Sequence, residues 1–237
     1  MGITEYKNKK ISILGDSIST FEGYSQPASA VFYDKDRKLS SGVLTVLDTW
    51  WGMLIDELDA EFLVNNSISG STVTWNSLYE VESYGCSDVR TKSLGKDGVD
   101  PDIIIVYLGL NDWGMGVKLT SDCQAEDKTS LAIFSVAYRK MLEKLKKNYP
   151  NAEIWCLTLP ISRCSQNEKF AFPYYNGGWH IAEYCEVIRN SALSCNCEII
   201  DLYKYSEPYD TIDGFHPNRE GMRKIAEGIL TILNQDD

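Results

Sequence analysis

The chain has 237 residues, of which 43% are hydrophobic and 24% charged, and these proportions are typical of an ordinary soluble globular protein. We expect a single domain over residues 1–237, long enough to bury a core without disulfides or metal ions. The formal net charge of −11 argues against nucleic acid and anionic membranes as partners, because both attract Lys and Arg rather than carboxylates.

Five short apolar segments have the length and composition of strands, and segments with helical spacing separate them. The strand-like segments lie at residues 10–15, 61–67, 101–109, 152–160 and 197–203. The third and fourth are continuous apolar runs, which is typical of strands buried on both faces of a sheet.

Apolar residues recur at helical spacing in four further segments. We expect helices over residues 48–58, from Leu131 to just before Pro150, around residues 181–188, and over residues 217–233, where Pro217 suits the first turn. Because strands alternate with helices, the sequence predicts an α/β fold with a parallel sheet between two layers of helices. Ligands of such folds bind beyond the carboxyl ends of the strands.

Residues that can carry out chemistry follow four of the expected strands. The first strand leads into a Gly-Asp-Ser turn that ends at Ser17, and Gly70 lies after the second strand. Asn111 comes after the third strand, and Asp213 and His216 come after the last. Because the ends of parallel strands share one edge of the sheet, we expect these five residues to meet there.

Each of these residue types suits one task in acyl transfer. The Ser17 hydroxyl is a weak nucleophile until an imidazole such as His216 takes its proton. The Asp213 carboxylate would fix the imidazole tautomer and stabilise the imidazolium. The backbone N–H groups of Ser17 and Gly70 and the amide of Asn111 would donate hydrogen bonds to the oxyanion of a tetrahedral intermediate. We therefore expect a catalytic triad and an oxyanion hole.

The four sequence blocks resemble those of the SGNH hydrolases, also called the GDSL esterase/lipase family. The blocks are GDSIS around Ser17, Gly70, GLND with Asn111, and DGFH with Asp213 and His216, and they occur in the family's order. The resemblance implies a flavodoxin-like three-layer α/β/α sandwich with a five-stranded parallel sheet. It also implies ester hydrolysis through an acyl-enzyme. The first block reads GDSI rather than GDSL, and the absence of a G-x-S-x-G pattern there argues against the ordinary α/β-hydrolase elbow.

Two carboxylates and a second histidine leave alternatives open. Asp210 is close to Asp213 in sequence and is the rival partner for the imidazole. Asp112 is expected to stabilise the Asn111 loop rather than to perform chemistry. His180 precedes an expected helix, so we interpret it as an N-terminal or surface residue, with the substrate pocket as the alternative.

Aromatic residues near the expected loops are the candidates for substrate contacts. We expect Trp75, Trp113 and Trp179 to bind substrate, and the alternative is that they seal loops onto the sheet. The long irregular segment of residues 163–179 suggests a functional loop or lid.

The cysteines predict a reducing compartment. Their number, seven, is odd, and the polar start of the chain does not look like a secretion signal, so we expect free thiols and a cytoplasmic location. No apolar run approaches the length that spans a membrane. Cys195 and Cys197 lack a second pair at zinc-site spacing, so we expect no metal, and the chemistry above needs no organic cofactor.

The leading functional hypothesis is a serine esterase that removes short acyl groups, such as acetyl, from a carbohydrate or a similar polar small molecule. The acidic chain and the tryptophan-rich loops favour a neutral substrate of this kind. A thioesterase or lysophospholipase is the first alternative, because the same triad attacks those substrates. A non-catalytic carbohydrate-binding protein is the second. The sequence leaves the oligomeric state open.

Overall fold

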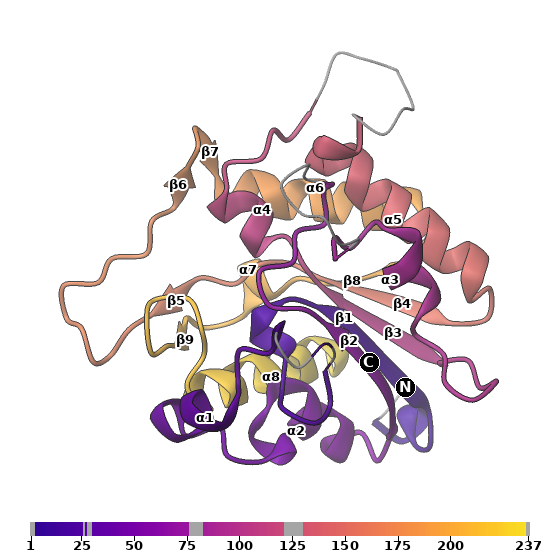
Figure 1. Cartoon of the computed structure of the whole chain (residues 1–237), viewed down its shortest axis with the longest axis horizontal. Helices are drawn as coiled ribbons and strands as arrows, with labels where there is room; N and C mark the ends of the chain where they lie inside the picture. The colour runs from indigo at the N-terminus through magenta and orange to yellow at the C-terminus, as the bar shows by residue number, and fades with distance from the viewer. Residues whose placement is uncertain (1–2, 26, 28–29, 76–82, 121–129, 236–237) are drawn as a thin grey trace.

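A five-stranded parallel sheet forms the centre of the fold (Figure 1). The computed structural model of the chain describes residues 3–25, 27, 30–75, 83–120 and 130–235. The sheet has the order β2-β1-β3-β4-β8, and every neighbouring pair is parallel. Its strands are β1 (Lys10–Gly15), β2 (Glu61–Ser67), β3 (Ile103–Tyr107), β4 (Glu153–Leu157) and β8 (Glu198–Ile200). The predicted α/β fold with five parallel strands is confirmed.

The order of the strands decides where a ligand can bind. β1 pairs with β2 on one side and with β3 on the other, so the chain reverses its direction of travel across the sheet between β1 and β3. Loops that leave such a pair of strands diverge, and a crevice opens at their carboxyl ends. Ser17 follows β1 and Asn111 follows β3, so both lie at this crevice.

Burial explains why these segments are strands. All five residues of β3 are buried, as their continuous apolar sequence predicts. β2 is an edge strand, and its first two residues are exposed. β3 is shorter than the apolar run of residues 101–109, because Gly109 turns the chain into the next helix with a φ of +126°.

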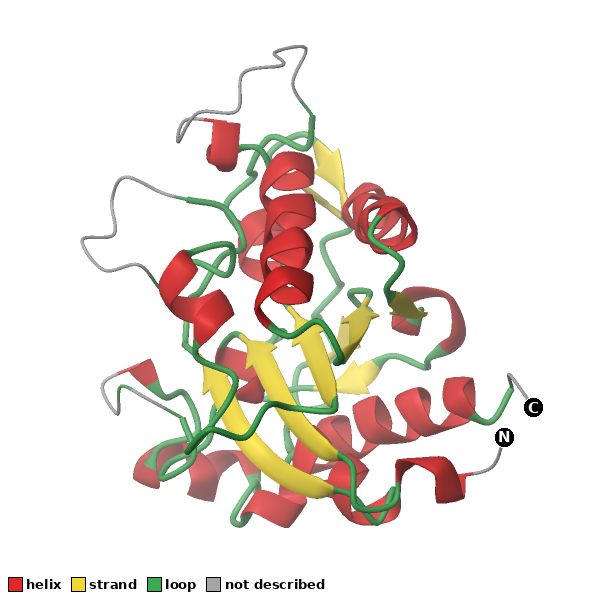
Figure 2. Cartoon of the chain, turned by 90° about the vertical axis from the view of Figure 1, so that its right-hand side faces the viewer, coloured by secondary structure: helices red, strands yellow, loops and turns green. Residues whose placement is uncertain are grey.

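Helices cover both faces of the sheet (Figures 1 and 2). On one face α2 (Trp50–Glu57) packs against α8 (Arg219–Leu233), and on the other α5 (Phe134–Asn148) packs against α6 (Ile181–Ser194). The apolar stripes of these helices and the sheet form one continuous buried cluster. The shorter helices are α1 (Lys35–Ser41), α3 (Asp88–Lys92), α4 (Leu110–Gly114) and α7 (Leu202–Tyr205).

The helix starts show which polar residues act as caps. The Thr49 hydroxyl accepts a hydrogen bond from the backbone N–H of Gly52 and caps α2. Asn218 caps α8, so the expectation that Pro217 belongs to the first turn is wrong, and Pro217 precedes the cap. The His180 ring accepts a hydrogen bond from the Ala182 N–H and caps α6. This confirms the interpretation of His180 as a residue of the helix N-terminus.

Short strands and turns complete the structure. β5 (Ser162–Arg163) pairs in parallel with β9 (Tyr209–Asp210), and β6 (Tyr175–Asn176) forms a hairpin with β7 (Trp179–His180). The sequence did not predict either pair, because two-residue strands carry no periodicity. The 3₁₀ turns are η1 (Ile3–Tyr6), η2 (Ser17–Ser19), η4 (Val46–Asp48) and η5 (Ser130–Ala132).

The structure also bears on the cysteines and on membrane-spanning segments. Six of the seven cysteines are free thiols, and Cys123 lies outside the described residues. Within the described ranges, no helix combines the length and the apolar character that crossing a membrane requires.

Candidate active site

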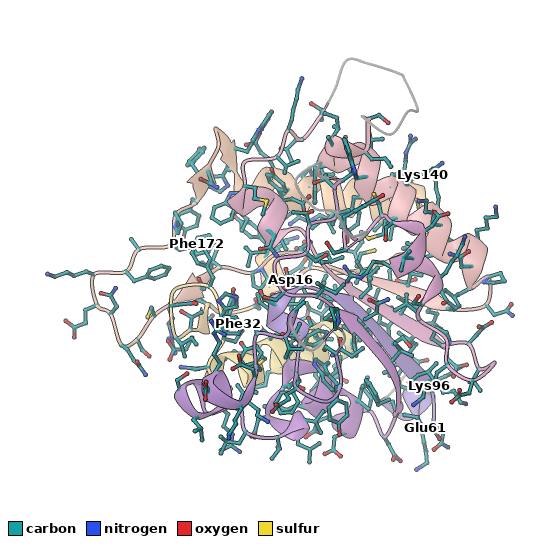
Figure 3. All side chains as sticks on the ribbon, viewed as in Figure 1. Asp16, Phe32, Glu61, Lys96, Lys140 and Phe172 are labelled. Atoms are coloured by element: carbon teal, nitrogen blue, oxygen red, sulfur yellow. The ribbon has the colours of Figure 1, made fainter. Side chains whose placement is uncertain are left out.

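Ser17, His216 and Asp213 meet at the carboxyl end of β1. The Ser17 Oγ lies 2.9 Å from Nε2 of His216, and Nδ1 of His216 lies 2.7 Å from Oδ2 of Asp213. Figure 3 shows Asp16, the neighbour of Ser17, toward this end of the sheet, whereas Glu61 and Lys96 lie at the opposite end. The three side chains that the sequence proposed as a triad are therefore within hydrogen-bonding distance in the expected order.

Ser17 stands on a sharp turn that its neighbour stabilises. It is the first residue of η2, directly after β1, and Oδ1 of Asp16 accepts a hydrogen bond from the backbone N–H of Ile18 at 3.0 Å. Burial raises the pKa of Asp16 to about 6, and the nearby charge of Asp112 adds to this effect. The Asp16 carboxyl is thus used to shape the turn that carries Ser17.

Buried hydroxyl groups hold the loop that carries His216. Three of them donate to backbone carbonyls of this loop: Ser162 to Gly214 at 2.5 Å, Tyr209 to Phe215 at 3.0 Å and Tyr33 to Pro217 at 2.7 Å. Burial raises the pKa of both tyrosines, which therefore keep the protons that they donate. The backbone on either side of the imidazole is fixed from three directions.

Asp213 is ionised at neutral pH. Burial by itself would raise the pKa of its carboxyl, but hydrogen bonds from the ring and backbone of His216 and from the backbone of Phe215 outweigh burial and lower the pKa to about 2. The rival carboxylate, Asp210, instead accepts hydrogen bonds from Ser165 and Asn218. Of the two candidates, Asp213 is the partner of the imidazole.

Gly70 and Asn111 lie on neighbouring loops that a hydrogen bond connects. Nδ2 of Asn111 donates to the Ser71 carbonyl at 2.9 Å and, in a longer hydrogen bond of 3.4 Å, to Oδ2 of Asp16. Gly70 has a φ of +76°, a conformation that favours glycine. No described residue accepts a hydrogen bond from the backbone N–H of Ser17 or of Gly70. These two backbone N–H groups are available as donors, whereas both N–H groups of the Asn111 amide have acceptors, so Asn111 must release its longer contact with Asp16 to bind an oxyanion.

Asp112 supports the Gly70 loop. Its buried carboxylate accepts hydrogen bonds from the backbone N–H groups of Val73 and Thr74 at 2.8 Å and 3.0 Å, and from the Thr74 hydroxyl at 2.7 Å. Burial raises the pKa of Asp112 to about 6, although these hydrogen bonds oppose the shift. Asp112 therefore has a structural task, as expected, but the loop that it holds follows β2 rather than carrying Asn111.

A cavity of about 350 Å³ opens beside the Ser17 hydroxyl. Its walls are mostly apolar and come from the turn after β1, from α4, from the segment of residues 163–179 and from the His216 loop. The lining residues are Ser17, Ile18, Leu110, Asn111, Trp113, Gly114, Pro173, Asn176, Phe215 and His216. The cavity thus brings Ser17, His216 and Asn111 together around one space.

The segment of residues 163–179 packs against α4 and forms one wall of this cavity. Nδ2 of Asn176 donates to the Trp113 carbonyl at 2.9 Å. Next to it the backbones of Gly116 and Gly177 touch, so that a Cβ atom on either residue would collide with the other. The contact requires glycine at both positions, and it fixes the wall that the segment contributes.

The three tryptophans proposed for substrate binding lie in different places. Trp113 lines the cavity, and its indole stacks on Phe172 with 5.6 Å between the ring centroids and 9° between the planes. Trp75 and Trp179 do not line this cavity; both are half-buried and pack against the core. A role for these two in substrate binding stays a prediction.

Two residues of the site have no signal in the sequence. The Phe32 ring stacks on the His216 imidazole, with 3.6 Å between the centroids and 9° between the planes. Arg90 is buried beneath the loops, where its guanidinium donates to the carbonyls of Gly15 and Asn66 and to the Ser71 hydroxyl. Neither lies near a motif, so only the folded chain reveals them.

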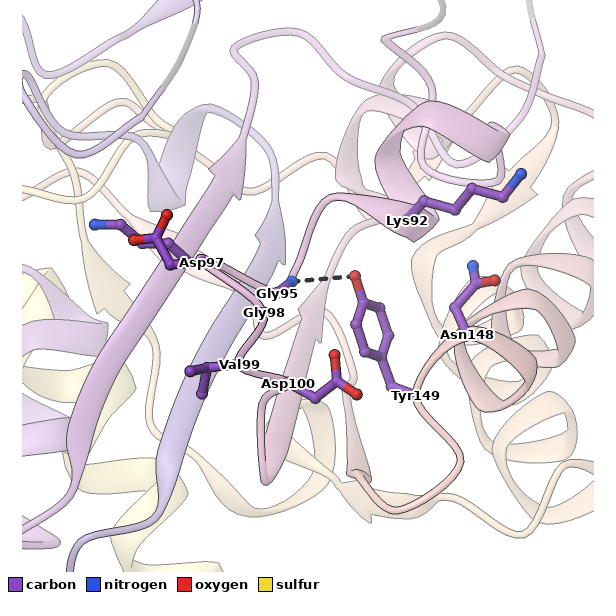
Figure 4. Close-up of a pocket in the computed structure, with 9 residues that line it drawn as sticks. Lys92, Gly95, Asp97, Gly98, Val99, Asp100, Asn148 and Tyr149 are labelled. Carbon is purple, nitrogen blue, oxygen red and sulfur yellow. Dashed lines mark hydrogen bonds between the residues drawn. The ribbon is translucent and has the colours of Figure 1, made fainter.

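A second cavity, of about 370 Å³, lies away from the triad (Figure 4). Polar and charged residues of the segment 92–100 and of the end of α5 line it. The Tyr149 hydroxyl at its centre accepts hydrogen bonds from the backbone N–H groups of Leu94 and Gly95, so it serves to hold the turn. In the part of the chain that the structure describes, no group of three or more His, Cys, Asp or Glu residues is placed to hold a metal ion.

Comparison with solved structures finds similar chains of nearly equal length. A protein from Bacteroides ovatus described as a GDSL-like lipase is 30% identical, with a TM-score of 0.75 over 97% of this chain and 99% of that chain. Another from Bacteroides uniformis, with the same description, is 29% identical, with a TM-score of 0.73 over 99% and 100%. A carbohydrate acetylesterase family member from Sinorhizobium meliloti is 20% identical, with a TM-score of 0.59 over 96% and 98%, and shares the fold.

The family comparison matches most of the parallel sheet and the segment around Ser17. None of the curated proteins compared with the chain matches it. The family model of the GDSL-like lipase/acylhydrolases matches residues 9–163, which is more than half of the chain. The chain belongs to the GDSL-like lipase/acylhydrolase family of the SGNH hydrolases and is a hydrolase that acts on esters.

Proposed function

We propose that the protein is a serine esterase that removes short acyl groups, chiefly acetyl, from a carbohydrate or a similar polar small molecule. The observation that supports it most is the line of hydrogen-bonded atoms from Asp213 through His216 to the Ser17 Oγ, which ends at a small cavity. A nucleophile, a base and an orienting carboxylate in this order are the parts that acyl transfer requires.

Ser17 attacks the ester in the first half of the reaction. Its Oγ forms a bond to the carbonyl carbon while Nε2 of His216 takes the hydroxyl proton. The negative charge on the carbonyl oxygen is stabilised by the N–H groups of Ser17, Gly70 and Asn111. When the intermediate collapses, His216 returns the proton to the leaving alcohol, and the acyl group stays on Ser17.

Water completes the reaction. It attacks the acyl carbon while Nε2 of His216 takes one of its protons, and a second tetrahedral intermediate forms. Collapse of this intermediate breaks the bond to the Ser17 Oγ, which recovers the proton from His216, and the carboxylic acid leaves. Asp213, with its low pKa, stays ionised and stabilises the imidazolium at each step.

The size of the cavity supports a short acyl group. Its volume of about 350 Å³ is near the lower end of the range for small-molecule sites, about 300–1,000 Å³. Pro173 and Asn176 line it on the side of the segment 163–179. The carbohydrate part rests on the polar acidic surface and on the fold shared with the acetylesterase family member from Sinorhizobium meliloti. A cytoplasmic location, which the free thiols favour, stays a prediction.

The test is hydrolysis of p-nitrophenyl esters from acetate to palmitate, followed by acetate release from acetylated sugars. We expect the acetate ester to be preferred, and Ser17→Ala to lose at least about 10³-fold in kcat. Ser194→Ala, an exposed serine on α6, is the matched control and should keep full activity.

Four results would contradict parts of the proposal. Preference for palmitate would contradict the short acyl group, and a preference for thioesters would point to a thioesterase. Unchanged turnover by Ser17→Ala would exclude Ser17 as the nucleophile. Sugar binding that survives Ser17→Ala, without turnover of any ester by the unmodified chain, would indicate a binding protein.

A further inference from the structure

The catalytic imidazole has a third neighbour besides Ser17 and Asp213. The phenyl ring of Phe32 lies flat on the His216 ring, with 3.6 Å between the centroids and an interplanar angle of 9°. Contacts of this kind restrict rotation of the imidazole about its Cβ–Cγ bond, because the ring cannot turn without separating from the phenyl face. Phe32 therefore acts on the orientation of the ring rather than on its hydrogen bonds.

Hydrogen bonds connect the segment around Phe32 both to the turn that carries Ser17 and to the loop that carries His216. Its backbone N–H donates to the Thr20 hydroxyl at 2.9 Å, and this hydroxyl donates to the Ser17 carbonyl at 2.9 Å. The next residue, Tyr33, donates its hydroxyl to the Pro217 carbonyl, directly after His216. The segment around Phe32 is thus tied to the turn of the nucleophile and to the loop of the base.

A cation completes the stack. The guanidinium carbon of Arg37 lies 4.7 Å from the centroid of the Phe32 ring, a cation–π distance, and Arg37 also pairs with Asp34 at 3.3 Å. Since the imidazole covers one face of the phenyl ring, the guanidinium takes the other. Neither face is left for a sugar, and Phe32 does not line the cavity, so a substrate platform is excluded for this ring.

The number of hydrogen bonds that orient the His216 imidazole changes during the reaction. In the free enzyme two hydrogen bonds orient the imidazole, one to Ser17 and one to Asp213. In the acyl-enzyme the Ser17 Oγ is esterified and has no proton to donate, so the first of these bonds is lost. The hydrogen bond between Nδ1 and Asp213 would by itself let the imidazole ring tilt about this contact. This would happen at the step in which Nε2 must take a proton from a water molecule.

We propose that Phe32, held by Arg37, is a positioning residue that keeps the His216 imidazole in its productive plane during hydrolysis of the acyl-enzyme. The inference rests on the proposed acyl-enzyme mechanism. It assigns Phe32 to the second half of the reaction, whereas acylation depends on it less because the Ser17 hydrogen bond is then intact.

The test compares Phe32→Leu with the unmodified chain on p-nitrophenyl acetate in a stopped-flow instrument. We expect kcat to fall about tenfold, as suits the loss of one stacked pair, while kcat/KM, which reports acylation, falls less than about threefold. Acyl-enzyme then accumulates, and p-nitrophenol appears in a burst whose amplitude approaches the enzyme concentration. Phe32→Tyr keeps the stacked ring and should restore both constants.

A matched control removes a different half-exposed aromatic ring. Phe62 lies at the start of β2, where it packs on Trp51 and Tyr24 away from the triad, and Phe62→Leu should leave kcat and the burst unchanged. Equal losses in kcat and kcat/KM for Phe32→Leu, or no loss at all, would overturn the proposal. Equal losses with a lowered Tm would mean that the ring only supports the local structure.

A spectroscopic readout separates this inference from the proposed function. The chain has two histidines, so the His216 ring signals can be resolved in ¹H–¹⁵N NMR spectra, with His180 as the internal reference. After reaction of Ser17 with phenylmethylsulfonyl fluoride, the His216 signals should broaden in Phe32→Leu but not in Phe32→Tyr. Identical His216 spectra in both variants would overturn the inference alone. Failure of Ser17 to react, with full turnover by Ser17→Ala, would overturn the proposed function and this inference with it.

Discussion

Replacing Arg90 by lysine tests how the fold holds the ends of its strands together. The Arg90 side chain is 1% exposed, and no carboxylate among the described residues lies within ion-pairing distance of it. Burial lowers the pKa of Arg90 to about 9, so the guanidinium is still charged at neutral pH. All five of its N–H donors have acceptors: the carbonyls of Gly15, Asn66 and Ser83, the Asn66 side-chain oxygen and the Ser71 hydroxyl.

The number of donors determines the expected loss of stability. A lysine ammonium has three N–H donors on a single nitrogen, so at least two of the five hydrogen bonds are lost in Arg90→Lys. A hydrogen bond that involves a charged group contributes about 1.5–3 kcal/mol. We therefore expect Arg90→Lys to lower the free energy of unfolding by about 3–6 kcal/mol.

Urea unfolding followed by tryptophan fluorescence measures this change. Arg139→Lys, at an exposed position of α5, is the control and should change stability by less than about 0.5 kcal/mol. A loss of under about 1 kcal/mol for Arg90→Lys would refute the reasoning, because the ammonium would then satisfy the site as well as the guanidinium does. Where Arg90→Lys stays folded, kcat should also fall, since Gly15 and Ser71 lie next to the loops of Ser17 and Gly70.

Two further predictions concern Asn111 and Asp16. Asn111→Ala should lower kcat by about 10²–10³-fold with little change in KM, because its amide acts on the oxyanion rather than on the bound ester, and equal rates for variant and unmodified chain would remove Asn111 from the oxyanion hole. For Asp16, burial raises the folded-state pKa from 3.8 to about 6, so between these pH values the folded chain keeps a proton that the unfolded chain has lost. The free energy of unfolding of the unmodified chain must therefore fall as pH rises through this window. Asp16→Asn keeps the side-chain oxygen for the Ile18 N–H but does not titrate. Relative to the unmodified chain, its free energy of unfolding should therefore increase by up to about 3 kcal/mol between pH 4 and pH 7. Urea midpoints at the two pH values check this, and a difference that does not change with pH would contradict it.

The sequence by itself determined the parts of this protein that depend on local pattern. Continuous apolar runs predicted β3 and β4 because a strand buried on both faces needs no polar side. Helical spacing predicted α5, α6 and α8, because each helix buries one stripe. The order of the four motifs then placed Ser17, Gly70, Asn111, Asp213 and His216 at one edge of the sheet, because parallel strands end on the same side.

Only the tertiary structure decided which side chains touch. Trp113 and not Trp75 or Trp179 lines the cavity, and the three look alike in the sequence because each stands near a loop. The stack of Phe32 on His216 joins residues 184 positions apart, and Arg90 meets acceptors from three different segments. Such contacts have no periodicity and no fixed spacing in the chain. They are set by where loops end after the sheet and its helices have packed, which is a property of the whole fold.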